Sequence, residues 1–432
     1  MNHTLASIVS FVFIFSALTA NADSRSAPAV PQLRLSEALA ELGNNNPMLK
    51  AYSEEASSRR ENIAPQAALE DPMLEIGLED FSASGLNSRT EGAGEVLAVR
   101  QALPFPGKRA ALKSAAGAEY EASQYDLAAK RLQLISEFKS KYSQLALEYA
   151  SLDLIKSQLQ LLRSLLDLAR NNYALSKVPQ VDVFTLQIEE ASLLDRELQA
   201  QSAIEQLRAE ANHFLGRESN PNWRPELLKA EDSVYPAVSA EALLARLLET
   251  NPDLRSVDRQ IRALEAKERY SKLGKLPDFE LSAAYKIKPR NDQDRGEDEV
   301  SAAIGITLPL WAPSKQDQLI KKSGADRRKS EALQVELRNE LVHALHRTLT
   351  AINANRERLA LIRTALRPLT EGAIISAQRA YGSGESALSA VLNLLRARYE
   401  TELSYQKILA EQNSNIAELE KLLGGELERV ES

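Results

Sequence analysis

The sequence predicts a mainly α-helical protein with a small β part, built from one unit that occurs twice and from very long antiparallel helices. Three observations support this fold class. The 432 residues are 44% hydrophobic but only 5% aromatic, a composition typical of long helices and coiled coils. The same short motifs recur about 205 residues apart. Alternating apolar and polar residues mark four short strands.

The charge and the scarcity of reactive side chains exclude several classes of function. The net charge is −7, and no basic stripe predicts a nucleic-acid partner. The absence of cysteine removes thiol catalysis, zinc-finger sites, disulfides and a lipid anchor attached through cysteine. The sequence contains no Gly-rich phosphate loop and no nucleophile elbow. We therefore expect neither an enzyme nor a bound cofactor or metal.

The N-terminal residues have the pattern of a signal peptide. Residues 5–20 form an uncharged apolar run that ends in the small-x-small sequence Ala20-Asn21-Ala22, typical of a cleavage site. No Lys or Arg precedes the run, and a buried N-terminal helix is the alternative interpretation. No later stretch reaches the length of a membrane helix. We expect a mature protein that begins near Asp23 and is exported through the inner membrane.

The two halves of the chain carry the same landmarks in the same order. The matching pairs, at offsets of 205 and then 208 residues, are Asn46-Pro47 and Asn251-Pro252, Leu103-Pro104 and Leu308-Pro309, and Leu215-Gly216 and Leu423-Gly424. Chance matches in a Leu-rich chain would not keep the proline and glycine landmarks in order. We expect a signal peptide at 1–22, a first repeat at 23–220, a linker at 221–238, a second repeat at 239–424 and a tail at 425–432.

Each repeat should begin with a helix, followed by two strands. In the first repeat we expect a helix over residues 35–69, capped by Ser36 and ended by Pro72. Strands are expected at residues 72–81, 95–103, 278–288 and 300–310, where apolar residues alternate with polar or small ones. Each strand has about ten residues, enough to cross an outer membrane at the tilt of a barrel strand.

Four strands cannot close a membrane barrel on their own, because single-chain outer-membrane barrels have at least about eight strands. An open edge in lipid would leave backbone N–H and C=O groups unpaired. If these strands cross a membrane, the chain must contribute them to a shared barrel, with eight strands from two chains or twelve from three. Two hairpins in a small soluble sheet explain the alternation equally well, but they explain neither the signal sequence nor the long helices.

The strands are followed by helices too long for a compact domain. We expect helices over residues 108–175 and 315–381, each about 100 Å long at 1.5 Å per residue. Short turns at 176–180 and 382–385 should lead into return helices that end at Gly216 and Gly424. In the second turn, Gly382 and Gly384 are expected to supply the left-handed backbone of a tight reversal.

This order of elements, repeated once, resembles the TolC-like outer-membrane efflux proteins over essentially the whole mature chain. Two shorter motifs, Leu-Pro-Phe-Pro-Gly-Lys-Arg at residues 103–109 and Tyr381-x-x-Gly384-Glu385, are similar to the heavy-metal-efflux branch. The resemblance implies a homotrimer whose long helical hairpins form an α-barrel across the periplasm and whose strands form a twelve-stranded transmembrane β-barrel in the outer-membrane lipid. It also implies docking, at the hairpin tips, to a periplasmic adaptor protein and an inner-membrane proton-driven pump of the resistance-nodulation-division class.

The expected function is therefore a passive duct from the periplasm to the exterior in a tripartite efflux system, with heavy-metal cations as cargo. Alternatives are a similar duct for drugs or secreted peptides, and a secreted coiled-coil scaffold that does not enter a membrane. A periplasmic adaptor is a further alternative, although adaptors carry one helical hairpin and not two in tandem.

The expected aperture departs from that of better-known family members. Those members carry an Asp-Val-Leu-Asp run just beyond the second tip, but here the acidic positions fall on Ala390 and Asn393. Asp182, the repeat equivalent of Ala390, keeps one carboxylate, and three symmetry-related copies could favour cations. A solvated Asp near a helix N-terminus is the alternative. The candidate aperture and tip residues are Asp182, Tyr381, Gly384, Glu385, Ala390 and Asn393.

One pair of histidines has a spacing that could hold a metal ion. His343 and His346 lie three residues apart on one face of a predicted helix. We expect them to be ordinary helix surface, and we expect any metal selectivity to belong to the pump and the adaptor.

Overall fold

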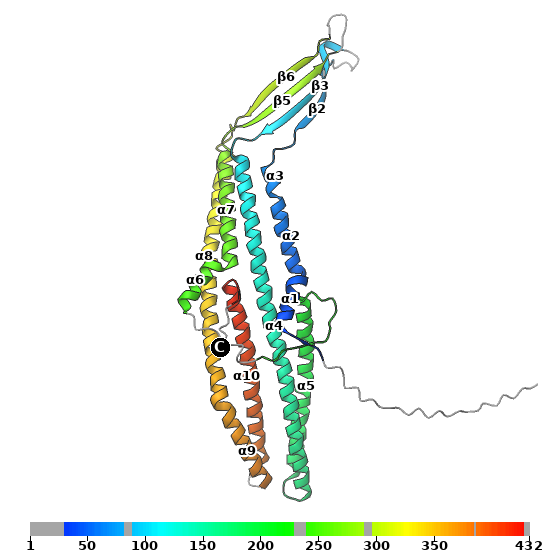
Figure 1. The fold of residues 1–432 in the computed structure, drawn as a ribbon, viewed down its shortest axis with the longest axis vertical. Helices are drawn as coiled ribbons and strands as arrows, with labels where there is room; N and C mark the ends of the chain where they lie inside the picture. The colour runs from blue at the N-terminus through cyan, green and yellow to red at the C-terminus, as the bar shows by residue number, and fades with distance from the viewer. Residues whose placement is uncertain (1–29, 82–88, 229–238, 289–295, 384–385, 427–432) are drawn as a thin grey trace, which may run out of the picture.

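The computed structural model describes residues 30–81, 89–228, 239–288, 296–383 and 386–426. The predicted signal peptide at 1–22 lies outside these residues. The molecule is elongated, with a sheet at one end and two helical hairpins that end at the other (Figure 1). This architecture confirms the predicted fold class. Among the described helices, none is both long enough and apolar enough to span a membrane.

The elements follow the predicted order in both halves of the chain. The strands are β1 (Gln32–Leu33), β2 (Met73–Phe81), β3 (Arg89–Leu103), β4 (Arg224–Pro225), β5 (Asp278–Ile287) and β6 (Glu299–Thr307). The helices are α1 (Leu35–Asn45), α2 (Pro47–Glu61), α3 (Ile63–Ala67), α4 (Lys108–Ala174), α5 (Gln180–Phe214), α6 (Ala240–Thr250), α7 (Pro252–Leu273), α8 (Gln316–Leu361), α9 (Arg367–Ser383) and α10 (Leu388–Leu422), with a π-helical turn, η2 (Ile362–Leu366), between α8 and α9.

The four long strands form one antiparallel sheet in the order β2-β3-β5-β6. The central pairing of β3 with β5 therefore joins the two repeats into one sheet. Two of the predicted strand limits were wrong. β3 begins at Arg89 and not at residue 95. β6 ends at Thr307 and not at residue 310, because the chain turns at Pro309, which has no N–H to donate to a ladder.

The single helix predicted over residues 35–69 was also wrong, because the structure divides it into α1, α2 and α3. The break after α1 lies at Asn46, whose backbone is extended, as expected for a residue that precedes proline. Its side chain accepts hydrogen bonds from Met48 N and Leu49 N and caps α2. The N-cap of α1 is Arg34 and not Ser36.

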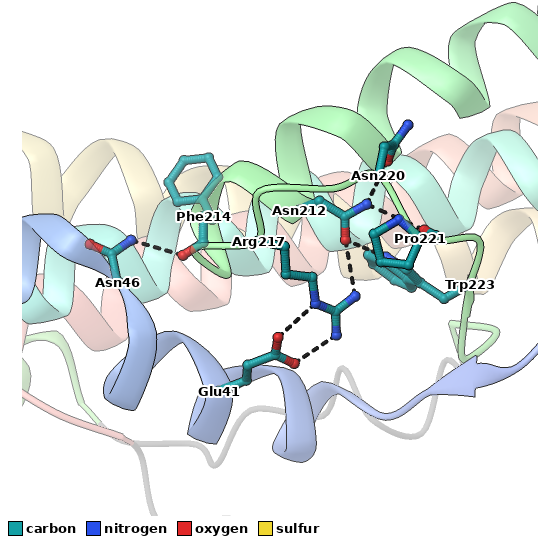
Figure 2. A network of polar contacts seen from close by, with 8 residues as sticks. All are labelled: Glu41, Asn46, Asn212, Phe214, Arg217, Asn220, Pro221 and Trp223. Atoms are coloured by element: carbon teal, nitrogen blue, oxygen red, sulfur yellow. Dashed lines mark hydrogen bonds and ion pairs between the residues drawn. The ribbon is translucent and has the colours of Figure 1, made fainter.

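The repeated Asn-Pro and Leu-Gly landmarks meet in space. Asn46 Nδ2 donates to Phe214 O at 2.8 Å (Figure 2), and Asn251 Nδ2 donates to Leu422 O at 3.1 Å. Each asparagine thus caps the start of one helix and the end of another.

The glycine of each Leu-Gly landmark is required by its backbone and by its surroundings. Gly216 and Gly424 both have positive φ values, 70° and 75°. A Cβ at Gly216 would lie 2.7 Å from Asn45 O, and one at Gly424 would lie 2.6 Å from Thr250 O. Only glycine fits both the left-handed conformation and this close approach.

A polar network around Asn212 holds the end of α5 in the first repeat (Figure 2). Asn212 Oδ1 accepts hydrogen bonds from Trp223 Nε1 at 2.8 Å and from Arg217 Nη1 at 3.0 Å. Arg217 also forms a two-contact ion pair with Glu41, at 2.6 Å for each contact. Trp223 stacks on Tyr142 of α4, and burial raises the pKa of Tyr142 to about 12. The segment after the first hairpin is therefore fastened to α4.

The two hairpins differ in the regularity of their first helix. α4 runs without interruption for 67 residues, about 100 Å. The corresponding helix of the second hairpin is interrupted by the π-helical turn η2 just before Pro368. Proline has no backbone N–H, so the regular helical hydrogen bonding is broken at this point. α4, α5, α9 and α10 share one apolar core, which includes Leu162 and Leu395.

Candidate functional site

One face of the sheet is apolar and exposed along all four strands. In register, Ile76 lies opposite Leu97, Leu97 opposite Tyr285, and Tyr285 opposite Val300. Directly opposed residues in antiparallel strands share a face, so these four side chains form one row. Their exposed fractions run from 42% for Tyr285 to 79% for Val300. An exposed apolar face of this extent is typical of a surface that meets lipid or another protein.

The other face of the same sheet is small and polar. Its corresponding row consists of Glu75, Ala98, Ala284 and Ser301. Glu75 forms an ion pair with Arg100 at 2.8 Å on this face. The sheet is therefore apolar on one side and water-compatible on the other, the reverse of a soluble sheet that buries its apolar side against helices.

Two strands of the sheet are edges within the described chain. β2 pairs only with β3, and β6 pairs only with β5. Such edges present unpaired N–H and C=O groups that can pair with another chain. If the sheet lies in lipid, these groups must be paired.

The 103–109 motif forms a joint between the sheet and the helices. Lys108, the first residue of α4, is buried, and its Nζ lies 2.7 and 2.8 Å from the two carboxylate oxygens of Asp278. Phe105 N donates to the same carboxylate at 2.7 Å, and the Phe105 ring stacks on Phe279. Gly107 caps α4 with a φ of 99°, which favours glycine. The contacts of this motif hold β5 against the start of α4.

The hairpin ends lie at the opposite end of the molecule from the sheet (Figure 1). The left-handed residue of the first turn is Ser176, with a φ of 55°. The prediction that Gly382 adopts a left-handed backbone was wrong, because Gly382 lies inside α9 and is not among the residues with positive φ. Gly384 and Glu385 lie outside the described residues.

Two of the candidate aperture residues contact each other across the hairpins. Tyr381 of α9 is 2% exposed, and its hydroxyl lies 3.5 Å from Asp182 Oδ2 in the first turn of α5. Burial, and then the nearby Asp182 charge, raise the pKa of Tyr381. The hydroxyl therefore stays protonated and can donate to the carboxylate. Ala390 and Asn393 lie on the exposed side of α10, whereas Leu392 is buried.

A charged link between the hairpins was missed by sequence reasoning. Arg396 of α10 pairs with Glu189 of α5, with its two nitrogens 3.2 and 2.5 Å from the carboxylate oxygens. The guanidinium of Arg196 also lies 5.6 Å from the centre of the Tyr399 ring. Glu189 and Arg396 are 207 residues apart, close to the 208-residue offset of the repeats. The exact repeat equivalent of Glu189 is Ala397, so the repeat did not mark this pair in the sequence.

The histidine pair gains no further ligand in the structure. His343 and His346 are both exposed on α8. Within the described residues, no group of three or more His, Asp or Glu side chains is placed to hold a metal ion. The candidate site therefore consists of the exposed sheet face and the contacts at the hairpin ends.

Comparison with known proteins agrees with this geometry. Residues 243–425, most of the second repeat, match the outer membrane efflux protein family. No curated protein matches the chain.

Solved structures match almost the whole chain. The outer-membrane channel OprN has 18% sequence identity and a TM-score of 0.76, and the match covers 90% of each chain. VceC from Vibrio cholerae has 18% identity and a TM-score of 0.74, over 91% of this chain and 96% of that one. CusC has 14% identity and a TM-score of 0.78, over 90% and 92%.

The fold is that of the outer-membrane channels. The second repeat carries the sequence pattern of the outer membrane efflux protein family, and the chain as a whole has the fold of the solved channels.

Proposed function

We propose that this chain is the outer-membrane duct of a tripartite efflux system, a passive channel from the periplasm to the exterior. The observation that carries the proposal is the four-stranded sheet, which exposes an apolar face and two free edges at the end of helices about 100 Å long. Soluble monomeric proteins rarely expose an apolar face of this extent, whereas the lipid of an outer membrane would cover it.

We propose a homotrimer as the assembly. The free edge of β6 can pair with β2 of a neighbouring protomer, and three chains of four strands close a twelve-stranded barrel. Closure satisfies the edge groups that lipid cannot solvate. The polar face, with Glu75 and Arg100, then lines a water-filled lumen.

The helical hairpins would cross the periplasm and meet the other components at their ends. Val181, Phe184 and Ile188 follow one another along α5 at helical spacing, and all three are exposed near the first hairpin end. They offer apolar surface to a neighbouring protomer or to the periplasmic adaptor, through which the duct would work with an inner-membrane proton-driven pump. The contact of Tyr381 with Asp182 at the same end is our candidate for the link that keeps the aperture closed.

We propose heavy-metal cations as the cargo, on the resemblance of residues 103–109 and of Tyr381-x-x-Gly384-Glu385 to the heavy-metal-efflux branch. The contacts of Lys108 and Phe105 are structural, so these residues mark the branch without binding the cargo. Drugs or secreted peptides are the alternative cargo, because a duct lined by mixed polar side chains has little need to recognise what it passes.

The assembly and the cargo can be tested separately. Membrane fractionation should place the mature protein in the outer membrane as an oligomer that separates only on boiling, and the purified oligomer should conduct ions in planar bilayers. A protein extracted without detergent would instead favour the secreted scaffold. Host cells that carry this chain with its pump and adaptor should gain tolerance to metal salts. A gain of tolerance to drugs alone would assign a different cargo.

A further inference from the structure

The two tryptophans of this chain have opposite environments. Trp223 is 3% exposed, stacks on Tyr142 and donates a hydrogen bond to Asn212. Trp311 is 75% exposed and follows the end of β6, where the sheet meets α8. A large aromatic side chain that projects from the body of the protein at this level calls for a partner.

Trp311 belongs to an apolar patch that continues the exposed sheet face. Ile304 and Ile306 lie on that face, and every second residue after them, Leu308 and Leu310, is apolar and exposed as well. Leu319, in the first turns of α8, adds a further exposed apolar side chain. The patch thus marks the end of the apolar face that lies toward the helices.

Backbone hydrogen bonds within the loop hold the turn that carries Trp311. Trp311 O accepts hydrogen bonds from Ser314 N at 3.1 Å and from Lys315 N at 2.9 Å, and Ala312 N donates to Pro309 O at 3.1 Å. The turn is therefore closed, and its apolar side chains are presented outward by a defined backbone.

The equivalent loop of the first repeat is arranged differently. Phe105, which corresponds to Leu310 at the 205-residue offset, stacks on Phe279, and its backbone N donates to Asp278. The first loop turns its aromatic ring toward the protein, while the second exposes Leu310 and Trp311. This difference between equivalent loops indicates a role for the second loop outside the protomer.

Basic residues follow this patch along the chain, at the start of α8. Lys315, Lys321 and Lys322 are all exposed, and none of them forms an ion pair with another described residue. By contrast, nearby Lys275 is paired with Asp317. Tryptophan at the boundary of an apolar band, with lysines just beyond it, is the arrangement that suits the boundary between lipid chains and phosphate headgroups.

We propose that the Leu308–Trp311 loop inserts into the headgroup boundary of the periplasmic leaflet of the outer membrane, with Lys315, Lys321 and Lys322 directed to lipid phosphates. The inference rests on the proposed outer-membrane duct, and it adds where along the molecule the periplasmic surface of the outer membrane lies. Trp311 then marks the position of this membrane surface.

The two tryptophans allow a direct test by fluorescence. The purified oligomer carrying W223F, in which Trp311 is the sole tryptophan, is reconstituted into vesicles of phosphatidylcholine and phosphatidylglycerol with bromine on the acyl chains. Trp311 emission should lose most of its intensity with bromine near the headgroup and less with bromine near the chain end. The matched W311F oligomer, which keeps Trp223, should keep its emission in both vesicles. If W223F fails to assemble, the difference between the wild type and W311F reports Trp311.

Other outcomes overturn the inference and leave the proposed function distinguishable from it. Trp311 emission that is unaffected by bromine but quenched by acrylamide would place the loop in water. Emission insensitive to both quenchers would place it against a neighbouring protomer. Ion conductance of the same vesicles checks the duct independently, so a conducting oligomer with an unquenched Trp311 refutes only the membrane contact.

Discussion

The Tyr381 hydroxyl lies 3.5 Å from the Asp182 carboxylate and so links the ends of the two hairpins. Tyr381 is buried, and Asp182 lies in the first turn of α5, where a negative charge is favoured by the helix dipole. The pair therefore joins a carboxylate acceptor to a donor that burial keeps protonated. In the duct that we propose, this contact must break if the hairpins move apart on opening.

We expect Tyr381→Phe to favour the open aperture. At 3.5 Å the contact is longer than an ordinary hydrogen bond, so its loss should cost the closed state at most about 1 kcal/mol, or at most about a fivefold shift in the open fraction. Single-channel recording in planar bilayers measures this shift. Tyr173→Phe is the matched control, because Tyr173 is the repeat equivalent of Tyr381 but is exposed. Equal effects of the two variants would show that the contact does not hold the aperture.

Acidic residues placed at the expected aperture should change ion conduction. Ala390→Asp with Asn393→Asp adds two exposed carboxylates per protomer on α10, and three protomers would concentrate them around the aperture. The expected result is a change in conductance or in its dependence on the cation. The control is Asn353→Asp with Ala354→Asp, which changes the same residue types on the exposed side of α8, far from the hairpin end. Conduction indistinguishable from wild type would mean that the constriction lies elsewhere.

The two faces of the sheet should respond differently to one charged residue. Ile304→Arg places a charge on the apolar face and should cost about 2–4 kcal/mol at the middle of the bilayer. Ala303→Arg places the same charge on the polar face, beside Ser282, and should be tolerated. The measurement is the yield of oligomer assembled in the outer membrane. Similar yields would mean that the apolar face does not meet lipid.

The asparagines that join the helix ends should matter for stability. Asn46→Ala removes two capping contacts and one hydrogen bond to Phe214 O, which should cost about 1–3 kcal/mol. Asn251→Ala should cost less, because Asn251 makes a single capping contact and a longer bond to Leu422 O. Thermal unfolding in detergent measures both losses.

Asn62→Ala provides the control for these two variants. Asn62 also lies between two helices, but its side chain makes no capping hydrogen bond. Its replacement should change the unfolding temperature little. A loss as large as that of Asn46→Ala would mean that the contacts to Phe214 and Leu422 do not account for the effect.

Much of the fold follows from local patterns. The two-residue period assigned Ile304 and Ala303 to opposite faces, and the long run without proline after Lys108 predicted α4 almost to its last residue. These features depend on neighbouring side chains and on helix and strand geometry alone. The errors were local as well. At Asn46, the effect of a following proline and the capping strength of asparagine outweighed the helical pattern.

The sequence by itself determined the repeat, the helices and the two faces of each strand, because each is specified within a few adjacent residues. Only the tertiary structure decided which distant residues meet. Lys108 reaches Asp278 across 170 residues, and Glu189 reaches Arg396 across 207. The pairing of β3 with β5, which brings the repeats into one sheet, is equally long-range. Such contacts depend on how whole helices and strands pack, and no short stretch of sequence specifies that packing.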